Sequence, residues 1–538
     1  MSVKLIKALQ NPTLYDHPTK EITVLETHIS WVILTGHYAY KIKKPVNFGF
    51  LDFSSLDKRK HFCHEELRLN RRLASELYIG VIPIYGTDTQ PRLAEQEEQN
   101  APEEQPIEYA LKMVQFDQSG LLDTLQETQQ LTPTHINALA KQLAEFHQTV
   151  SSHPPNSEFG ASPAVFAPVN ENFEQIQTAL PPSQPQAQLN QLKRWATSEF
   201  NLLKARIDQR KQQGFVRECH GDLHLGNITL FNQSLTIFDC IEFNPSLSWI
   251  DVISDLAFLV MDLEMRGEKT FANQLTNCYL ETTGDYQGAA LLKFYKAYRA
   301  MVRAKVAVLS LDNHHEAADA NAQLMQRYQQ YIALATRYER PSHCYLLVMH
   351  GLSGSGKSNI SRQLVEQLGA IRIRSDVERK RLFHYNAETD TQSPPDGGIY
   401  TQNATKMTYD HVAGLSENLL KAGLPVIVDA ANLKQWQRNL FRDIAINEGA
   451  PLLIISCHAS SDILRARVIK RAEQNEVGEE HDASEAKIDT LETQFQMSEP
   501  LSDAELKYAI QIDTSQPNPL AVVIKRVKSL FPDESMHV

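Results

Sequence analysis

The chain has 538 residues, a net charge of −12 and a hydrophobic content of 42%. This length predicts at least two domains, and the acidic balance argues against a general nucleic-acid or membrane-surface binder, although a local basic groove stays compatible with it. The chain has no run of 18 apolar residues, and its cysteines form no CxxC pair. We therefore expect a cytoplasmic protein with reduced thiols and no membrane association. The sequence carries no signal for an oligomeric state.

The first predicted elements with functional residues are a strand, a helix and a second strand. In the strand "YAYKIK", Ala39 and Lys41 are two residues apart and therefore lie on one face. In the helix "KRKHFCHEELRLNRRLASEL", Glu66 falls within the apolar stripe. An inward carboxylate needs a cationic partner, for which Lys41 is the candidate. With the strand "EYALKMVQF", the pattern predicts a small lobe at about residues 20–116.

The segment "HGDLHLGN" is open to three interpretations. Its two histidines and aspartate would form a metal site only if they converged, but Gly221 and Gly226 favour a loop. A catalytic loop for phosphate transfer needs an asparagine five residues after its aspartate, and Asp222 and Asn227 have that spacing. The hairpin pattern "ITLFNQSLTIFD" then ends at Asp239. The order of these features along the chain favours a phosphotransfer loop over a metal site and over a polar loop without a catalytic role.

Together these segments resemble the aminoglycoside phosphotransferase and choline kinase-like superfamily over roughly residues 20–330. The resemblance implies a bilobal, protein-kinase-like (α+β) fold that uses ATP and Mg²⁺. Of the family's glycine-rich loop only Gly36 is present, and His220 is expected to be a scaffold residue. The site residues that the resemblance implies are Asp222 as the catalytic aspartate, Lys41 and Glu66 for ATP, and Asn227, Asp239 and Glu242 for magnesium.

Two groups of charged residues after this loop give conflicting indications about the acceptor. The acidic group would suit a cationic acceptor, although its first two members are more often residues that brace the loop. The basic group would suit an anionic acceptor or the other domain, although a solvated helix face is the more frequent role. The acidic residues are Asp251, Asp255, Asp262 and Glu264, and the basic ones are Lys296, Arg299 and Arg303.

A domain boundary is predicted where a long helical pattern stops at Pro341 and the apolar run "CYLLVMHG" follows. We divide the chain into residues 1–340, with a larger lobe at about 117–340, and residues 341–538. In the second part, "YLLVM", "AIRIR", "PVIVD", "PLLIIS" and "YAIQID" alternate with helical segments. This alternation predicts an α/β domain with a parallel sheet.

The segment "GLSGSGKS" matches the phosphate-binding pattern GxxxxGK[ST] between a strand and a helix. Its backbone amides would surround the phosphates, its lysine would reach the β- and γ-phosphates, and its last serine would hold magnesium. Asp429, the single acidic residue of "PVIVD", is the second candidate magnesium ligand of this site, whereas a motor ATPase needs a longer acidic strand. The predicted nucleotide-binding residues are Gly351, Leu352, Ser353, Gly354, Ser355, Gly356, Lys357 and Ser358.

Charged residues beyond this motif favour a small kinase. Asp376 and Arg379 follow the second strand at the mouth of the phosphate site, and Arg379 is a candidate substrate-binding residue. Arg465, Arg467 and Arg471 begin a segment that predicts a closing lid, with a surface helix face as the alternative. The region resembles the small P-loop kinases grouped with gluconate and shikimate kinases, polynucleotide kinase and zeta-type toxins. The resemblance implies that Asp376 contacts the acceptor hydroxyl and that Arg467 and Arg471 contact phosphates.

The whole chain resembles the bacterial fusion of an aminoglycoside phosphotransferase-like domain with an AAA-type P-loop domain. We expect a bifunctional ATP-dependent kinase in which each site transfers phosphate to a hydroxyl of a small-molecule or nucleotide-like acceptor. Two alternatives stay open. One domain can be a nucleotide-binding regulator of the other, or the protein can be a nucleic-acid end kinase or zeta-toxin-like enzyme, against which the acidic charge counts.

Overall fold

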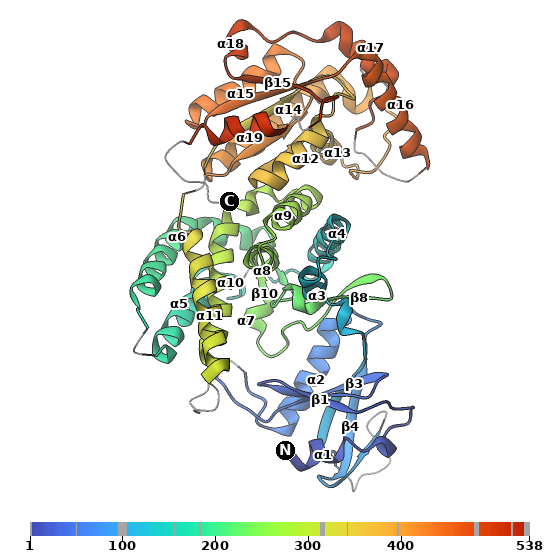
Figure 1. The fold of residues 1–538 in the computed structure, drawn as a ribbon, viewed down its shortest axis with the longest axis vertical. Coiled ribbons are helices and arrows are strands. Elements are labelled where there is room, and N and C mark those ends of the chain that lie inside the picture. The colour runs from blue at the N-terminus through green and yellow to red at the C-terminus, as the bar shows by residue number, and fades with distance from the viewer. Residues whose placement is uncertain are drawn as a thin grey trace. The chain divides into compact units, whose positions relative to one another are not determined.

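The computed structural model describes residues 3–531 other than 50, 95–104, 155, 182–183, 312–317, 342, 395–396, 478–483 and 518–519. The chain forms two compact units (Figure 1). The first comprises Met1–Asp262 and Tyr295–Ile332, and the second comprises Leu263–Phe294 and Ala333–Val538. The second unit therefore includes a segment that lies well upstream of Pro341.

The first unit begins with an antiparallel six-stranded sheet in the order β1-β2-β3-β6-β4-β5. Helix α2 (Leu56–Asn70) packs against β6 and β4 and begins after Ser55, whose side chain accepts a hydrogen bond from Lys58 N. This cap fixes where the helix starts. The strands are β1 (Thr23–Glu26), β2 (Ser30–Leu34), β3 (Tyr38–Lys43), β4 (Tyr78–Thr87), β5 (Gln90–Leu93) and β6 (Glu108–Val114), after α1 (Val3–Ala8) and η1 (Pro12–Leu14).

The larger lobe is helical and holds the predicted hairpin, which is present as β8 (Ile228–Phe231) and β9 (Ser234–Ile237). Its two turn residues, Asn232 and Gln233, have φ values of 50° and 64°, which is the backbone of a two-residue hairpin turn. The other elements are α3 (Leu122–Glu127), α4 (Pro133–Thr149), α5 (Ser162–Ala179), α6 (Ala187–Gln212), β7 (Val216–Glu218), η3 (Leu225–Asn227), α7 (Pro245–Ser248), β10 (Trp249–Asp251), α8 (Val252–Met265), α10 (Ala289–Leu309) and α11 (Ala318–Arg337).

The second unit contains the predicted parallel sheet, in the order β12-β13-β11-β14-β15. Alternate strand residues such as Leu347 and Met349 pack with α12 and α19, and α14 and α15 contact β13 and β11 on the other face. The strands are β11 (Leu346–His350), β12 (Ile371–Arg374), β13 (Val426–Asp429), β14 (Leu452–His458) and β15 (Ala509–Asp513). The helices are α12 (Lys357–Leu368), α13 (Ser375–Leu382), α14 (Gln402–Lys421), α15 (Gln435–Asn447), α16 (Ser461–Val477), α17 (Ile488–Met497), α18 (Asp503–Leu506) and α19 (Leu520–Lys528).

Helix α9 (Lys269–Thr283) follows α8 in the chain but packs on α12 and on the edge strand β12. The side chain of Asn277 accepts a hydrogen bond from Arg372 N at 2.7 Å and donates one to Ala370 O at 3.1 Å. Glu281 forms ion pairs with Arg372 at 3.1 Å and Arg374 at 3.0 Å. The helix thus satisfies backbone groups that an open sheet edge would leave unpaired.

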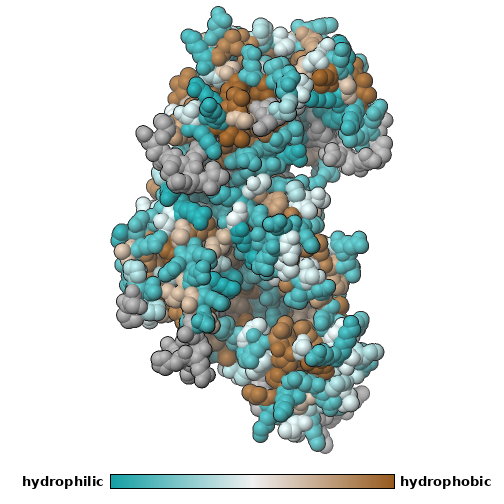
Figure 2. Space-filling view, viewed as in Figure 1, coloured by the Kyte–Doolittle hydropathy of each residue, from teal (hydrophilic) through white to brown (hydrophobic). Residues whose placement is uncertain are grey.

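The visible surface in Figure 2 is mostly hydrophilic, and its hydrophobic residues gather in small groups. Among the helices that the structure describes, none combines the length and apolarity that a bilayer crossing requires.

Replacing Asn277 with alanine is expected to destabilise the second unit. The change leaves a buried N–H and a buried C=O of the β12 edge without their partner, which costs roughly 1–3 kcal/mol for each unsatisfied group. Chemical denaturation measures the effect, and Thr282→Ala, an exposed site on the same helix, serves as the control with a change below about 0.5 kcal/mol. Equal stabilities for the two variants would show that α9 does not support the strand.

Candidate active sites

The predicted lysine–glutamate ion pair of the first unit is present. Lys41 Nζ, on β3, lies 2.7 Å from Glu66 Oε1, on α2, and 2.6 Å from Asp239 Oδ1, just after β9. Glu66 is fully buried, whereas the side chain of Asp239 is 42% exposed. Gly36 lies in the turn between β2 and β3, where its N–H donates to Gln115 Oε1 at 2.8 Å. Three segments far apart in sequence therefore converge on one lysine.

A second lysine, Lys43, was missed by the sequence interpretation. Its ammonium group is buried and bridges Glu66 Oε2, at 2.6 Å, to Glu242. Lys43 is two residues from Lys41, so the alternation that placed Lys41 on the inward face applies to Lys43 as well. Burial alone would raise the pKa of Glu66. The positive charges of Lys41 and Lys43 outweigh this effect and hold the pKa of Glu66 below its usual value. Burial raises the pKa of Glu242, and the negative charge of Glu66 raises it further. The positive charge of Lys43 offsets only part of this increase.

Asp222 lies in the loop before η3 with its carboxylate one-third exposed. Asn227 Nδ2 donates to Asp222 O at 2.9 Å and to its Oδ2 at 3.4 Å, so the two predicted residues are together. His224 Nε2 lies 3.5 Å from the same carboxylate. Although burial opposes them, His224, Arg303 and His220 lower the pKa of Asp222. The carboxylate is therefore ionised at neutral pH and able to accept a proton or a hydrogen bond.

Asp239 and Asn227 have the chemistry of magnesium ligands. Both offer side-chain oxygens, which this hard cation prefers, and both flank the β8–β9 hairpin. Asp239 has a φ of 64°, an unusual conformation for a residue other than glycine, and its N–H donates to the Tyr78 hydroxyl at 3.2 Å. This backbone turns its carboxylate toward Lys41. The donor set therefore fits the metal that the resemblance implies.

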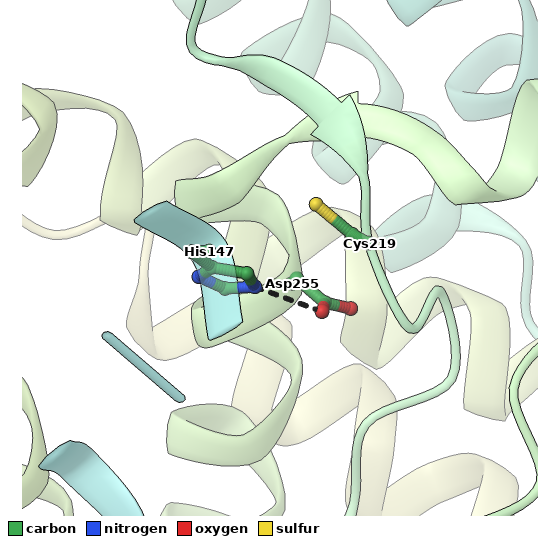
Figure 3. A group of neighbouring side chains, drawn as sticks. All are labelled: His147, Cys219 and Asp255. Carbon is green, nitrogen blue, oxygen red and sulfur yellow. Dashed lines mark hydrogen bonds and ion pairs between the residues drawn. The ribbon is translucent and has the colours of Figure 1, made fainter. Parts of the chain in front are cut away.

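The catalytic loop is braced from α8. Asp255 Oδ2 accepts a hydrogen bond from His220 N at 3.0 Å, and Oδ1 accepts one from Gly221 N at 2.9 Å. His147 Nε2 lies 3.2 Å from Oδ2 of the same carboxylate (Figure 3). Gly221 has a φ of 88°, and a Cβ there would lie 2.7 Å from Leu247 O. The loop backbone thus depends on a glycine and on a fully buried carboxylate.

Among the described residues, His147, Cys219 and Asp255 form the one group of three or more His, Cys, Asp or Glu side chains close enough to share a metal ion (Figure 3). Both oxygens of Asp255 already accept hydrogen bonds. Burial raises the pKa of the Cys219 thiol well above its usual value, whereas a metal needs the thiolate. The group acts as a brace, and His220, whose Nε2 lies 2.7 Å from Phe238 O, has a scaffold position.

Other charged residues near the loop are also internal. Asp251 forms a buried ion pair with Arg210 at 2.7 Å, and Asp262 accepts a hydrogen bond from Leu225 N at 3.0 Å. The expected solvated basic face on α10 is wrong for Arg299, which is buried and donates to Gly221 O at 3.0 Å. This burial could not be predicted from the sequence because the hydrogen-bond acceptors of Arg299 lie on distant segments. For Asp251 and Asp255 we now propose a bracing role.

The glycines of the second site are needed for close approach of the backbone. Gly351 and Gly354 have φ values of 141° and 77°, and a Cβ would lie 2.3 Å from Cys457 O and 2.7 Å from Leu464 O respectively. Gly356, with a φ of 84°, caps the start of α12. The loop between β11 and α12 therefore has the strand–loop–helix form that cradles phosphate.

Lys357 and Ser358 stand at the first turn of α12. Lys357 Nζ donates to Leu352 O at 2.8 Å, and burial lowers the pKa of this lysine. Because burial disfavours the uncompensated positive charge, an anion beside Lys357 would stabilise the charged lysine and be stabilised by it. Asp429, at the end of β13, accepts from Ser361 Oγ at 2.8 Å and lies 3.5 Å from Ser358 Oγ. The hydroxyl and the carboxylate supply the oxygen donors that magnesium would need at this loop.

The three arginines of the predicted lid already have protein partners. Arg467 Nη1 donates to Gly354 O at 3.2 Å and to Thr514 Oγ1 at 2.9 Å, and Arg471 Nη2 donates to Ala486 O at 2.8 Å. Arg465 pairs with Glu492 at 2.8 Å on the surface. The middle of the predicted lid, residues 478–483, lies outside the described residues.

A cavity of about 1030 Å³ extends from the phosphate loop to Asp376 and Arg379 on α13. It is lined also by Lys357, Asp429, Arg467 and Arg471, so the structure brings the predicted residues of this site together. This volume lies at the upper end of the range of small-molecule pockets, roughly 300–1,000 Å³. The sequence interpretation missed several other lining residues, which have no motif: Tyr400, Gln402, Lys406, Tyr409, Lys434 and Trp436.

Comparisons with known proteins match the two regions of the chain that contain these candidate sites. Residues 58–292 match the phosphotransferase enzyme family and residues 346–499 match the AAA domain family. An uncharacterized protein of Mycobacterium tuberculosis is 27% identical over 462 residues, which are 85% of this chain and 89% of that protein. The chain therefore carries a phosphotransferase-family region followed by an AAA-type P-loop region, as the motifs indicated.

Two solved kinase structures are also similar. A gluconokinase from Sinorhizobium meliloti 1021 shares 20% identity at a TM-score of 0.26 and covers 36% of this chain and 99% of its own. A choline/ethanolamine kinase family protein from Mesorhizobium loti shares 13% identity at a TM-score of 0.36 and covers 62% of this chain and 98% of its own.

Replacing Lys43 with methionine is expected to destabilise the first unit by roughly 3–5 kcal/mol, because it leaves two buried carboxylates without their shared cation. The adjacent Lys44 pairs with Glu26, whose side chain is 65% exposed, so Lys44→Met should cost at most about 1 kcal/mol. Denaturant titration of both variants makes the comparison. A small effect at Lys43 would mean that Lys41 alone holds Glu66 and that Glu242 is protonated.

His350 is expected to make the second unit sensitive to acid. It lies at the end of β11, with its Nδ1 3.0 Å from Ser456 Oγ. Burial is the main cause that lowers its pKa to about 4, and the positive charges of Arg438 and Lys357 add to this effect. The negative charge of Glu505 opposes it. A neutral histidine stabilises the fold above its unfolded pKa of about 6.5, and this contribution is lost as the pH falls from there toward the folded pKa.

The measurement is thermal unfolding at pH 7.5 and pH 5. The decrease in Tm between pH 7.5 and pH 5 should be smaller in His350→Gln than in the wild type. His458 is an exposed histidine at the end of β14, so His458→Gln should show the same decrease as the wild type. The same acid sensitivity in all three proteins would exclude His350 as its source.

Proposed function

We propose that this phosphotransferase is bifunctional, with one ATP–Mg²⁺ site in each unit and phosphate transfer from each to a hydroxyl group of an acceptor. One observation supports the proposal. Each unit holds a lysine, oxygen ligands for a divalent metal and an aspartate that can take a proton, and the two sets share no residue. A lone nucleotide-binding regulator would need only the first two of these.

In the first unit, Lys41 binds the phosphates of ATP and Glu66 fixes the direction of the lysine. Asp239, which pairs with Lys41 here, and Asn227 would hold the magnesium ion. Bound magnesium would neutralise charge on the transferring phosphate. Asp222 orients the acceptor hydroxyl and accepts its proton. Its lowered pKa keeps it ionised, and the braces from Asp255 hold its loop in place.

In the second unit, the amides of the loop from Gly351 to Ser358 bind the phosphates, and Lys357 reaches those that react. Ser358 and Asp429 would hold the metal. Asp376, in the first turn of α13, makes no hydrogen bond or ion pair within the described part of the chain, and it lines the same cavity. A carboxylate without a protein partner at this position is available to an acceptor hydroxyl. Arg467 and Arg471 act from the lid side of the cavity.

For the first site, Asp222→Asn is expected to abolish phosphate transfer while leaving nucleotide affinity within about 2-fold, since Asp222 faces the acceptor. The assay is transfer from labelled ATP to a pool of hydroxylated metabolites, with products identified by mass, and Lys357→Ala as background to silence the second site. Asp16→Asn, an exposed aspartate of the same unit, is the control. Wild-type transfer by Asp222→Asn would exclude the assignment.

For the second site, Lys357→Ala is expected to weaken one of two nucleotide sites by about 30- to 150-fold, the equivalent of roughly 2–3 kcal/mol for a charged hydrogen bond. Calorimetry with a non-hydrolysable ATP analogue and magnesium should show two sites in the wild type and in the control Lys525→Ala, and one in Lys357→Ala. A single site in the wild type would exclude bifunctionality, and loss of both sites in Lys357→Ala would exclude independent domains.

A further inference from the structure

Gln494, on α17, contacts the phosphate loop of the second site from a helix that follows the predicted lid in the chain. Its side-chain Oε1 accepts a hydrogen bond from Ser353 N at 2.8 Å, and both residues line the cavity. The N–H of Ser353 belongs to the same peptide as Leu352 O, which accepts the hydrogen bond from Lys357 Nζ at 2.8 Å. One peptide of the loop therefore contacts Gln494 at one end and the lysine of the site at the other.

The geometry of this peptide separates two possible roles of Gln494. A trans peptide is planar, so its N–H and its C=O point in opposite directions. Lys357, which reaches the reacting phosphates, lies on the C=O side, whereas the carboxamide of Gln494 lies on the N–H side. The carboxamide therefore orients the peptide and does not take the place of a phosphate oxygen beside the lysine.

The contact between Lys357 and Leu352 O is compatible with bound nucleotide. A lysine ammonium has three donors, and within the described part of the chain Lys357 Nζ has one hydrogen-bond acceptor, so two donors remain for phosphates. The lysine stem is flexible, and a carbonyl that holds the ammonium removes freedom that phosphate binding would otherwise have to remove. This advantage exists only while the peptide itself keeps its orientation.

Apolar contacts hold the same part of the loop against α16 and α17. Leu352 packs against the cluster that Leu464 and Val468 of α16 form with Leu491 of α17. A Cβ on Gly354 would lie 2.7 Å from Leu464 O, so α16 lies directly against the loop. Apolar contacts have no preferred direction, so they fix the Leu352 side chain but not the rotation of the peptide that follows it. That rotation needs a hydrogen bond, whose strength depends on its angle.

We propose that Gln494 is a positioning residue of the second site, an inference that rests on the transfer function proposed for that site. Its carboxamide fixes the Leu352–Ser353 peptide, the carbonyl of this peptide fixes the Lys357 ammonium, and the ammonium meets the reacting phosphates. Gln494 itself touches no phosphate. The helix pair α16 and α17, which brings Arg467 to the cavity, thus also sets the position of the lysine.

The experiment is a double-mutant cycle on the full-length protein, in which calorimetry measures the affinity for a non-hydrolysable ATP analogue with magnesium. The second site is the one that Lys357→Ala weakens, and enough analogue is added to fill it in every variant. Gln494→Met keeps the length of the side chain and removes its hydrogen bond. It should weaken the second site by about 5- to 30-fold, within the range for members of one hydrogen-bond network.

The second arm of the cycle tests whether Gln494 acts through the lysine. In the Lys357→Ala background, Gln494→Met should weaken the site by less than about 2-fold further, because the group that Gln494 positions is gone. A merely structural role would lower Tm and give effects on affinity that add. Gln496→Met is the matched control, because Gln496 is an exposed glutamine on the same helix, and it should bind the analogue like the wild type.

Three results would overturn the inference. They are an unchanged affinity in Gln494→Met, effects of the two substitutions that add in the double variant, and tighter binding in Gln494→Met, as expected of a side chain that occupies a phosphate position. The inference and the proposed function can fail separately, since the cycle measures binding at equilibrium. A protein that shows the coupling but transfers no phosphate from this site refutes the proposed function alone, and one that transfers phosphate without the coupling refutes the inference alone.

Discussion

The carboxylate of Glu66 lies in the interior of the first unit with a lysine on each oxygen. A buried charge is tolerated only when an opposite charge and hydrogen bonds compensate it, and this constraint organises the site. Glu66 ties α2 to β3, Lys43 extends the connection to Glu242, and Lys41 extends it to Asp239. A single network of alternating positive and negative side chains therefore connects the small sheet, its helix and the hairpin of the larger lobe.

The same constraint separates residues that support a site from residues that serve a ligand. Asp255 has three donors on its two oxygens and is fully buried, so it has nothing left for a substrate. Asp239 is the opposite case, with an exposed carboxylate whose one ionic partner is Lys41, a cation that nucleotide phosphates would attract. In the second unit, Asp376 lines the cavity and makes no hydrogen bond or ion pair with the described residues, so its carboxylate is left for a ligand.

Helix α9 makes the second unit depend on an upstream segment. Asn277 and Glu281 provide partners for the backbone and the arginines of β12, and β12 leads directly into Asp376. Arg372, held by Glu281, also lies 3.4 Å from Ser361, which binds Asp429. The acceptor side and the metal side of the P-loop site are thus both supported by a helix that lies in sequence between α8 and α10, the helices that brace the first catalytic loop.

The sequence by itself determined the local elements whose rules are short-range. Alternation placed Lys41 on the inward face, helical periodicity placed Glu66 inside, the glycine pattern of the phosphate loop fixed its turns, and five apolar runs marked the parallel strands. It did not predict Lys43, the burial of Arg299 or the role of α9, because each depends on a partner that many residues of chain separate from it. Periodicity indicates which face of a strand or helix is buried, but it does not indicate which charged side chain of another segment will pair with a residue on that face. That pairing was decided only by the tertiary structure.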